Sequence, residues 1–146
     1  RKLGHARQLG ATDTFSAADP DCVANVRDAT GGGLMYVFEA AGTVEAMETA
    51  YAVTRRGGTL TSVGLSHPET KFSIQHVNLV AEEKTIKGCY LGSCVPVRDI
   101  PRYIGLYQRG LLPVDKLITR KIPLDEINEA FDRLDAGEEL RQVIMI

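Results

Sequence analysis

Hydrophobic residues along this chain follow two alternating patterns: short continuous runs, and longer segments in which they recur about every 3.6 residues. The clearest runs are 34–38 and 59–63, and the first is typical of a strand covered on both faces. Such alternation predicts βαβ units, and therefore an α/β fold with a parallel sheet. Between the two runs, Thr43 is a suitable N-cap for a helix whose apolar positions are Ala46, Met47, Ala50, Tyr51 and Val53.

Glycine, proline and charged residues mark the ends of the other elements. The helix between the two runs is expected to continue through Arg55 and Arg56, whose positive charges suit its C-terminal end, and to stop at Gly57. The segment 19–21, Asp-Pro-Asp, predicts the start of an earlier helix, which the glycines 31–33 end. The remaining predicted helices are 2–9, 75–83, 97–109 and 124–136, and the remaining predicted strands are 14–15, 71–74, 85–89, 117–123 and 142–146.

The composition is that of an ordinary globular protein, with 44% hydrophobic and 25% charged residues among 146, and no apolar run long enough to span a membrane. The net charge of −2 and the scattered basic residues argue against nucleic acid or an anionic membrane as a partner. Three cysteines without zinc-finger spacing favour a reducing cytoplasm over a disulfide-stapled fold. Because the sequence opens at Arg1 without a Met or a signal-peptide pattern, within a predicted helix, we expect a fragment of a longer cytoplasmic protein.

Two predicted strands run directly into glycine-containing segments. Glu39-Ala40-Ala41-Gly42 follows the first strand, and Val63-Gly64-Leu65 ends the second. Open α/β sheets bind ligands at the carboxyl edge of the strands, and glycine lets the backbone approach a flat ring or a phosphate closely. Taken singly, each glycine more often marks an ordinary turn. Taken together, the two segments predict a ligand-binding edge.

Several further segments strengthen this interpretation: Ala6–Thr12, Phe38–Gly42, Arg56–Thr59, Val63–Leu65, Lys87–Ser93, Leu124–Phe131, Gly137-Glu138 and Arg141. The tail 124–131 is the most specific, because an ordinary amphipathic helix need not carry Asn128 and the pair Ala130-Phe131 at those places. In this order and at this spacing, the segments resemble the second half of the zinc-type medium-chain alcohol dehydrogenases. The resemblance covers nearly the whole chain.

The resemblance implies a truncated Rossmann-type, doubly wound parallel sheet in residues 1–90, and a segment 91–146 that returns towards the catalytic lobe. It also implies a set of cofactor-binding residues. Lys2 would lie near the adenosine ribose, and Arg141 would reach the pyrophosphate, because a planar guanidinium can serve two phosphate oxygens together. The nicotinamide half would be contacted by Ala40, Ala41, Gly42, Val63, Gly64, Leu65, Cys89 and Leu91.

The implied activity is hydride transfer between an alcohol or aldehyde and NAD, with formaldehyde-adduct and nitrosothiol chemistry as relatives. NADP stays open, because the acidic residue that binds the ribose hydroxyls would lie upstream of Arg1. Zinc would polarise the alcohol oxygen, but its ligands would belong to an N-terminal lobe outside this sequence. No catalytic or metal-binding residue is therefore assigned here, and the chain alone is predicted to be inactive. His5, His67 and His76 are interpreted as surface or helix residues.

The family resemblance also implies a homo-oligomer, either dimer or tetramer, in which the region from Phe72 to Gly88 contributes to the contact. Two other functions remain open. A zinc-free quinone or enoyl reductase of the same superfamily would share the cofactor fold, because the segment 86–88 and the Asn-Glu-Ala-Phe tail occur more broadly than in alcohol dehydrogenases. A non-catalytic Rossmann-like binding module would share the fold without the chemistry.

Overall fold

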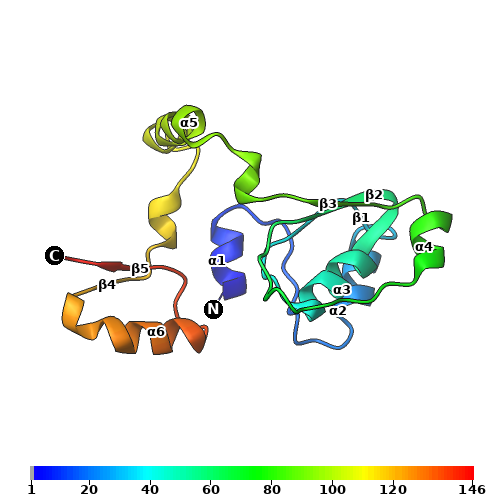
Figure 1. Cartoon of the computed structure of the whole chain (residues 1–146), viewed down its shortest axis with the longest axis horizontal. Coiled ribbons are helices and arrows are strands. Elements are labelled where there is room, and N and C mark those ends of the chain that lie inside the picture. Colours follow the sequence, from blue (N-terminus) through cyan, green and yellow to red (C-terminus); the bar gives the residue numbers. More distant parts are fainter. Residues whose placement is uncertain (1) are drawn as a thin grey trace. The chain divides into compact units, whose positions relative to one another are not determined.

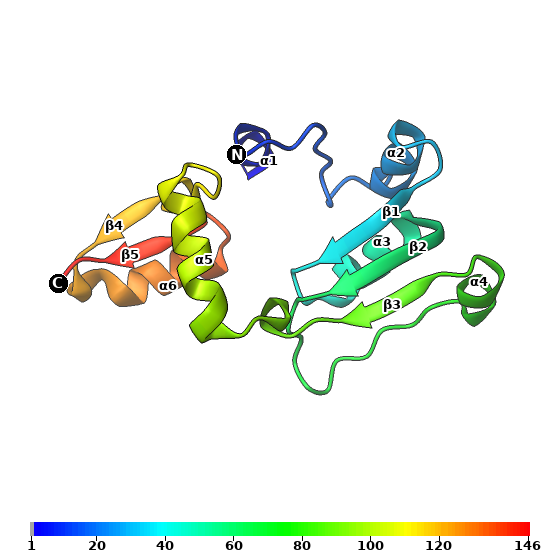
Figure 2. The ribbon, with the colours of Figure 1, turned by 90° about the horizontal axis from the view of Figure 1, so that it is seen from above.

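Three parallel strands organise the first part of the chain in the computed structural model, which describes residues 2–146. The strands β1 (Leu34–Glu39), β2 (Thr54–Ser62) and β3 (Thr85–Gly88) form one sheet in the order β1-β2-β3. Figure 2 shows the three strands side by side, pointing the same way. The predicted α/β fold with a parallel sheet is therefore confirmed.

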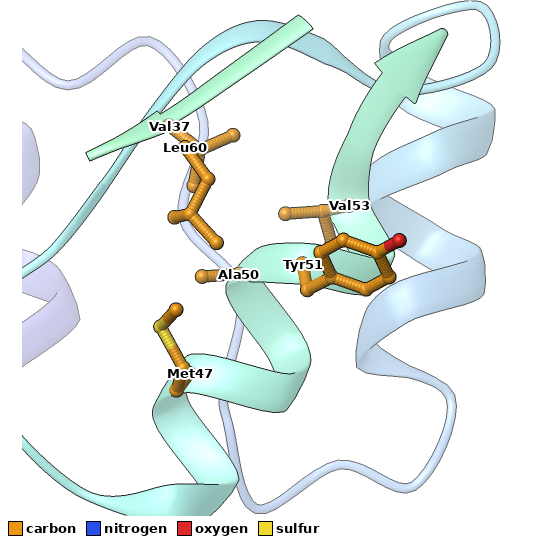
Figure 3. Packing of buried hydrophobic residues seen from close by; sticks show 6 residues of the cluster. All are labelled: Val37, Met47, Ala50, Tyr51, Val53 and Leu60. Atoms are coloured by element: carbon orange, nitrogen blue, oxygen red, sulfur yellow. The ribbon is translucent and has the colours of Figure 1, made fainter. Parts of the chain in front are cut away.

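The crossover from β1 to β2 is the helix α3 (Val44–Val53), which packs on the sheet, and α2 (Cys22–Ala29) packs against α3. Thr43 caps α3 as the sequence predicts, since its side chain accepts a hydrogen bond from Ala46 N at 3.2 Å. The helix presents one apolar face to the sheet, with β-branched and aliphatic residues opposite it. Figure 3 shows the resulting core, which consists of Val37, Met47, Ala50, Tyr51, Val53 and Leu60.

The chain forms two compact units, Arg1–Cys94 and Val95–Ile146. Besides the sheet and its two helices, the first unit contains α1 (Lys2–Gln8), α4 (His76–Ala81) and the short 3-10 turn η1 (Leu91–Ser93), all labelled or coloured along the chain in Figure 1. The second unit contains α5 (Pro96–Gln108), η2 (Val114–Leu117), β4 (Arg120–Ile122), η3 (Leu124–Glu126), α6 (Ile127–Asp135) and β5 (Gln142–Ile144).

In the second unit, β4 and β5 pair in parallel, and α6 connects them. Ala130 on α6 is buried, and its carbonyl oxygen accepts a hydrogen bond of 2.6 Å from the Gln142 side chain at the start of β5. Glu139 is also buried and forms an ion pair with Arg120 at 3.2 Å. The strand–helix–strand order therefore repeats, on a smaller scale, the parallel connection of the first unit.

The structure corrects the predicted C-terminal end of the helix between the first two strands. α3 ends at Val53, and Arg55 and Arg56 belong to β2. The hydroxyl of Thr54 donates to Ala50 O at 2.7 Å, and the pairing with β1 then shifts register before Thr59. The two arginines lie in this irregular stretch of the strand, so the rule that places positive charge at a helix end misassigned them.

Other predicted strands are absent from the structure or shorter in it. No strand forms at 14–15 or at 71–74, because neither segment pairs with another strand among the described residues; Thr14 instead accepts a side-chain hydrogen bond from Arg7 at 2.9 Å. The predicted strand 117–123 shortens to Arg120–Ile122, since the preceding η2 occupies Val114–Leu117. One face of residues 34–38 is uncovered in this structure, as Tyr36 and Phe38 are 73% and 72% exposed.

Candidate functional site

The carboxyl ends of β1 and β2 meet at one edge of the sheet. Glu39 and Ser62 are register partners, and the segments beyond them approach closely. A Cβ added to Gly64 would lie only 2.2 Å from Gly42 N, so a side chain at this position would collide with the facing backbone. Gly42 itself has a φ of +73°, which glycine adopts without strain. The structure therefore brings together the two glycine-containing segments that the sequence singles out.

The third strand ends beside them. Cys89 N donates to Ser62 O at 2.9 Å, which holds the residue after β3 against the end of β2. Leu91 follows in η1 with a φ of +47° and a side chain that is 69% exposed. A bulky residue in the left-handed region is uncommon, and such strain occurs often at ligand-binding segments. Cys89 and Leu91 thus lie at the same edge of the sheet as Gly42 and Gly64.

Four exposed residues at this edge form an open surface, which we call the rim: Ala40, Ala41, Val63 and Leu65. Leu65 is 83% exposed, whereas Gly42 and Gly64 beneath the rim are half-buried. A cavity of about 500 Å³ lies beside the end of β1 and is lined by residues of β1 that include Glu39, by Ala40 and Ala41 after the strand, and by residues of α3. Small side chains and uncovered backbone groups are the features that let a flat ring lie close to a sheet edge.

A buried carboxylate joins the two segments beneath this rim. One carboxylate oxygen of Glu39, Oε1, accepts hydrogen bonds from Ala41 N and Gly42 N, both at 2.6 Å. The other, Oε2, accepts the hydroxyl of Ser62 at 3.1 Å. The backbone oxygen of Glu39 accepts Val63 N at 2.7 Å and Gly64 N at 3.1 Å. Glu39, only 4% exposed, thereby contacts both strand ends at once.

Sequence reasoning assigned no role to Glu39. Its signal in the sequence is an acidic residue at the end of an otherwise apolar strand, followed by three small residues. Burial by itself raises the pKa of the Glu39 carboxyl, but the hydrogen bonds from Gly42, Ala41 and Ser62 together outweigh it, so the pKa lies below its ordinary value. The carboxyl group is therefore ionised at neutral pH, and its bonds are charge-assisted.

Lys2 and Arg141 belong to segments of the chain other than these strand ends. Lys2 is exposed on α1. Arg141 is exposed in the second unit, immediately before β5, and its backbone is anchored because Thr119 N donates to Arg141 O at 2.8 Å. The binding of the ribose by Lys2 and of the pyrophosphate by Arg141 stays a prediction.

Among residues 2–146, no group of three or more His, Cys, Asp and Glu side chains is placed to hold a metal ion. His5, His67 and His76 lie on separate segments of the first unit. None of the helices described for these residues is both long and apolar enough to cross a membrane.

The comparison with protein families decides the identity of the fold. Residues 1–109 match the family model described as zinc-binding dehydrogenase. The chain belongs to this family. The resemblance to the C-terminal part of zinc-type medium-chain alcohol dehydrogenases is thereby confirmed, and with it the Rossmann-type character of the sheet.

Individual relatives of this zinc-binding dehydrogenase chain agree with the family match. The NDMA-dependent alcohol dehydrogenase of Amycolatopsis methanolica is 37% identical over 150 residues, which include 99% of this chain and 40% of that protein. Alcohol dehydrogenase 1 of Oryza sativa subsp. indica is 33% identical and is covered to 38%. The crystal structure of benzyl alcohol dehydrogenase from Acinetobacter calcoaceticus superposes with a TM-score of 0.92 at 32% identity, over 99% of this chain and 40% of that one. The chain thus spans about two fifths of the length of these relatives.

Proposed function

We propose that these residues form the nicotinamide-facing part of an NAD(P)-dependent alcohol dehydrogenase. The observation that carries the proposal is the convergence of three strand ends on one open rim, with Gly64 packed against Gly42 so closely that a side chain on Gly64 would collide with the backbone of Gly42. The alcohol dehydrogenases among the relatives support the reaction class. Substrate contacts would come mostly from the part of such an enzyme that these residues do not include.

The residues at the rim fit the cofactor in their size and polarity. Ala40 and Ala41 would lie beside the nicotinamide, and Val63, Gly64 and Leu65 would pass under it and offer backbone groups to its carboxamide. Cys89 and Leu91 would contact the nicotinamide from the end of β3. Gly42 would let the segment after β1 turn away from the ring. The bound nicotinamide supplies the hydride acceptor for the alcohol. The protein segment contributes orientation and the exclusion of water, and no acid or base from it is required.

Zinc would be held outside these residues, because the described part of the chain offers no suitable set of ligands. We therefore propose that the 146 residues by themselves have no dehydrogenase activity and that the metal and the proton relay come from the catalytic lobe of the full-length protein. In this arrangement residues 1–90 act as the partial dinucleotide-binding domain, and 91–146 return towards the catalytic lobe, with Arg141 reaching the pyrophosphate and Lys2 the adenosine ribose.

A homo-oligomer, dimer or tetramer, is part of the same proposal. β3 is an edge strand of the three-stranded sheet, and the region Phe72–Gly88 exposes Val77 and Val80 at 67% and 64%. An uncovered strand edge with apolar residues beside it is suited to pairing with a second copy. Light scattering of the full-length protein tests this directly, and a strictly monomeric enzyme would rule it out.

The experiment for the main proposal is a titration of the full-length protein with NADH and, separately, with NADPH, followed by cofactor fluorescence. Leu65→Glu places a carboxylate where the nicotinamide would lie and should weaken binding about tenfold or more. Val97→Glu is the matched control, because Val97 is 89% exposed on α5 and Leu65 is 83% exposed. Equal affinity of the two variants, or no binding of either cofactor to the unmodified protein, would exclude the proposed site. Metal analysis and an alcohol-oxidation assay then separate the zinc enzyme from a zinc-free reductase.

A further inference from the structure

Glu39 is the one buried acidic residue at the carboxyl edge among the residues described, and with only 4% of its surface exposed it offers little area to a cofactor. It lies beneath the rim, whereas the exposed groups above it belong to Ala40, Ala41 and the segment 63–65. The question is why a charged side chain occupies a place where an apolar one would cost less to bury. The contacts of its two carboxylate oxygens answer it.

Each carboxylate oxygen of Glu39 accepts hydrogen bonds from a different strand end. Oε1 takes both N–H groups of the turn that follows β1, namely those of Ala41 and Gly42. Oε2 takes the hydroxyl of Ser62, at the end of β2, and lies where a Cβ on Gly64 would be only 2.9 Å away. A neutral apolar side chain would leave both amide groups without an acceptor, so the turn would relax away from β2. The carboxylate therefore fixes the separation of the two segments, not merely the shape of one turn.

We propose that Glu39 is a positioning residue for the cofactor: its carboxylate holds the segments 40–42 and 63–65 at the separation that receives the nicotinamide, without contacting the ring. This inference rests on the proposed function. The inference adds to the proposed function that a residue beneath the site, Glu39, determines how well the nicotinamide half of the cofactor fits. The adenosine half of the cofactor would bind elsewhere and does not depend on this carboxylate.

The test compares two ligands on the full-length protein: the reduced cofactor that it binds, NADH or NADPH, and the fragment that lacks nicotinamide, ADP-ribose or its 2′-phosphate. Glu39→Ala should weaken binding of the whole cofactor about tenfold or more and change the affinity for the fragment less than about twofold. Glu39→Gln should restore affinity to within about threefold, because its Oε1 can accept both amides and its Nε2 can donate to Ser62. The split between the two ligands is a result that a general loss of stability would not produce.

Thr54→Val is the matched control. Thr54 is fully buried, and its hydroxyl bonds Ala50 O at the opposite end of β2, so its loss destabilises the same sheet away from the rim. This variant should lower the free energy of unfolding and leave both affinities unchanged. If Glu39→Ala fails to fold, Ser62→Ala removes only the Oε2 contact and should still weaken cofactor binding about threefold, with the fragment unaffected.

The possible results of these binding experiments distinguish a failure of the positioning role from a failure of the proposed function. Equal losses for cofactor and fragment, or no loss for either in the Glu39 and Ser62 variants, would overturn the positioning role while leaving the proposed function intact. Failure of the unmodified protein to bind any of the ligands would instead overturn the proposed function itself.

Discussion

Gly64 offers the sharpest test of the site geometry, because a single methyl group should disrupt it. A Cβ built on Gly64 lies 2.2 Å from Gly42 N and 2.6 Å from Gly42 Cα, both distances far shorter than any real contact of a Cβ atom. The alanine can be accommodated only if the backbone of one segment moves by about 1 Å, since packed interiors do not compress. That movement would also pull Gly42 N away from the carboxylate of Glu39, to which it now donates at 2.6 Å.

Two costs therefore add for Gly64→Ala. Forcing an extra methyl group into a packed site costs about 1–3 kcal/mol, and the loss of a hydrogen bond to a charged group costs about 1.5–3 kcal/mol. Because the two share the same backbone shift, the sum is smaller than full additivity, and we expect a loss of about 3 kcal/mol in the free energy of unfolding. For a domain whose total stability is about 5–15 kcal/mol, this is a large fraction.

Gly88→Ala is the matched control, since Gly88 ends β3 as Gly64 follows β2. A Cβ on Gly88 would meet no atom within 4 Å, so the substitution should change the free energy of unfolding by less than about 0.5 kcal/mol. Urea denaturation of both variants, followed by far-ultraviolet circular dichroism, measures the difference. If Gly64→Ala and Gly88→Ala unfold at the same urea concentration, the close approach of the two strand ends is not a property of the folded protein.

Three further predictions concern the core and the carboxylate. Leu60→Ala should lower the free energy of unfolding by about 2–5 kcal/mol in the same urea assay, because Leu60 is fully buried between the sheet and α3; a smaller loss would mean that the core is loosely packed. Tyr51→Phe should raise it by about 1 kcal/mol, since the buried hydroxyl of Tyr51 finds no partner among the described residues, and a clear loss instead would reveal an acceptor such as an ordered water. The pKa of Glu39 lies below its unfolded value of 4.5, so its contribution to stability is present above pH 4.5 and is lost as the pH falls through the folded pKa. Urea midpoints measured from neutral to acidic pH should therefore decline less steeply in Glu39→Gln than in the unmodified chain, and identical slopes would contradict the low pKa.

Local patterns were sufficient to predict the framework of the first unit. The alternation of apolar runs with helical periodicity placed β1, α3 and β2 in the right order, and Thr43 marked the start of α3 because its capping bond is made within four residues. The end of α3 could not be predicted in the same way. Thr54 joins β2 because it pairs with Leu34, a contact between residues far apart in sequence that no local rule on helix ends contains.

In the candidate site too, features with a local sequence signal were predictable and features that depend on tertiary contacts were not. Gly42 and Gly64 were recognisable because a glycine after a strand has a local signature, whereas their direct contact depends on the register between β1 and β2. Glu39 went unassigned because an acidic residue at a strand end can face solvent or the core, and only the tertiary structure turns it inward onto three donors. Single-sequence reasoning can therefore identify which backbone segments approach a ligand more readily than which side chains hold them there.

On the exposed face of β1, the sequence indicates a contact with protein that the described residues do not make. Side chains alternate along a strand, so Val37 and Glu39 face the helices and are buried, while Tyr36 and Phe38 face the other way and are exposed. Had that second face been selected for contact with water, polar residues would alternate with the apolar ones, as they do on half-covered strands. Two aromatic residues there instead indicate a face selected for burial against protein, which the described residues do not supply. A strand pattern typical of coverage on both faces, with one face uncovered here, therefore supports the proposal that the sheet acts within a larger enzyme.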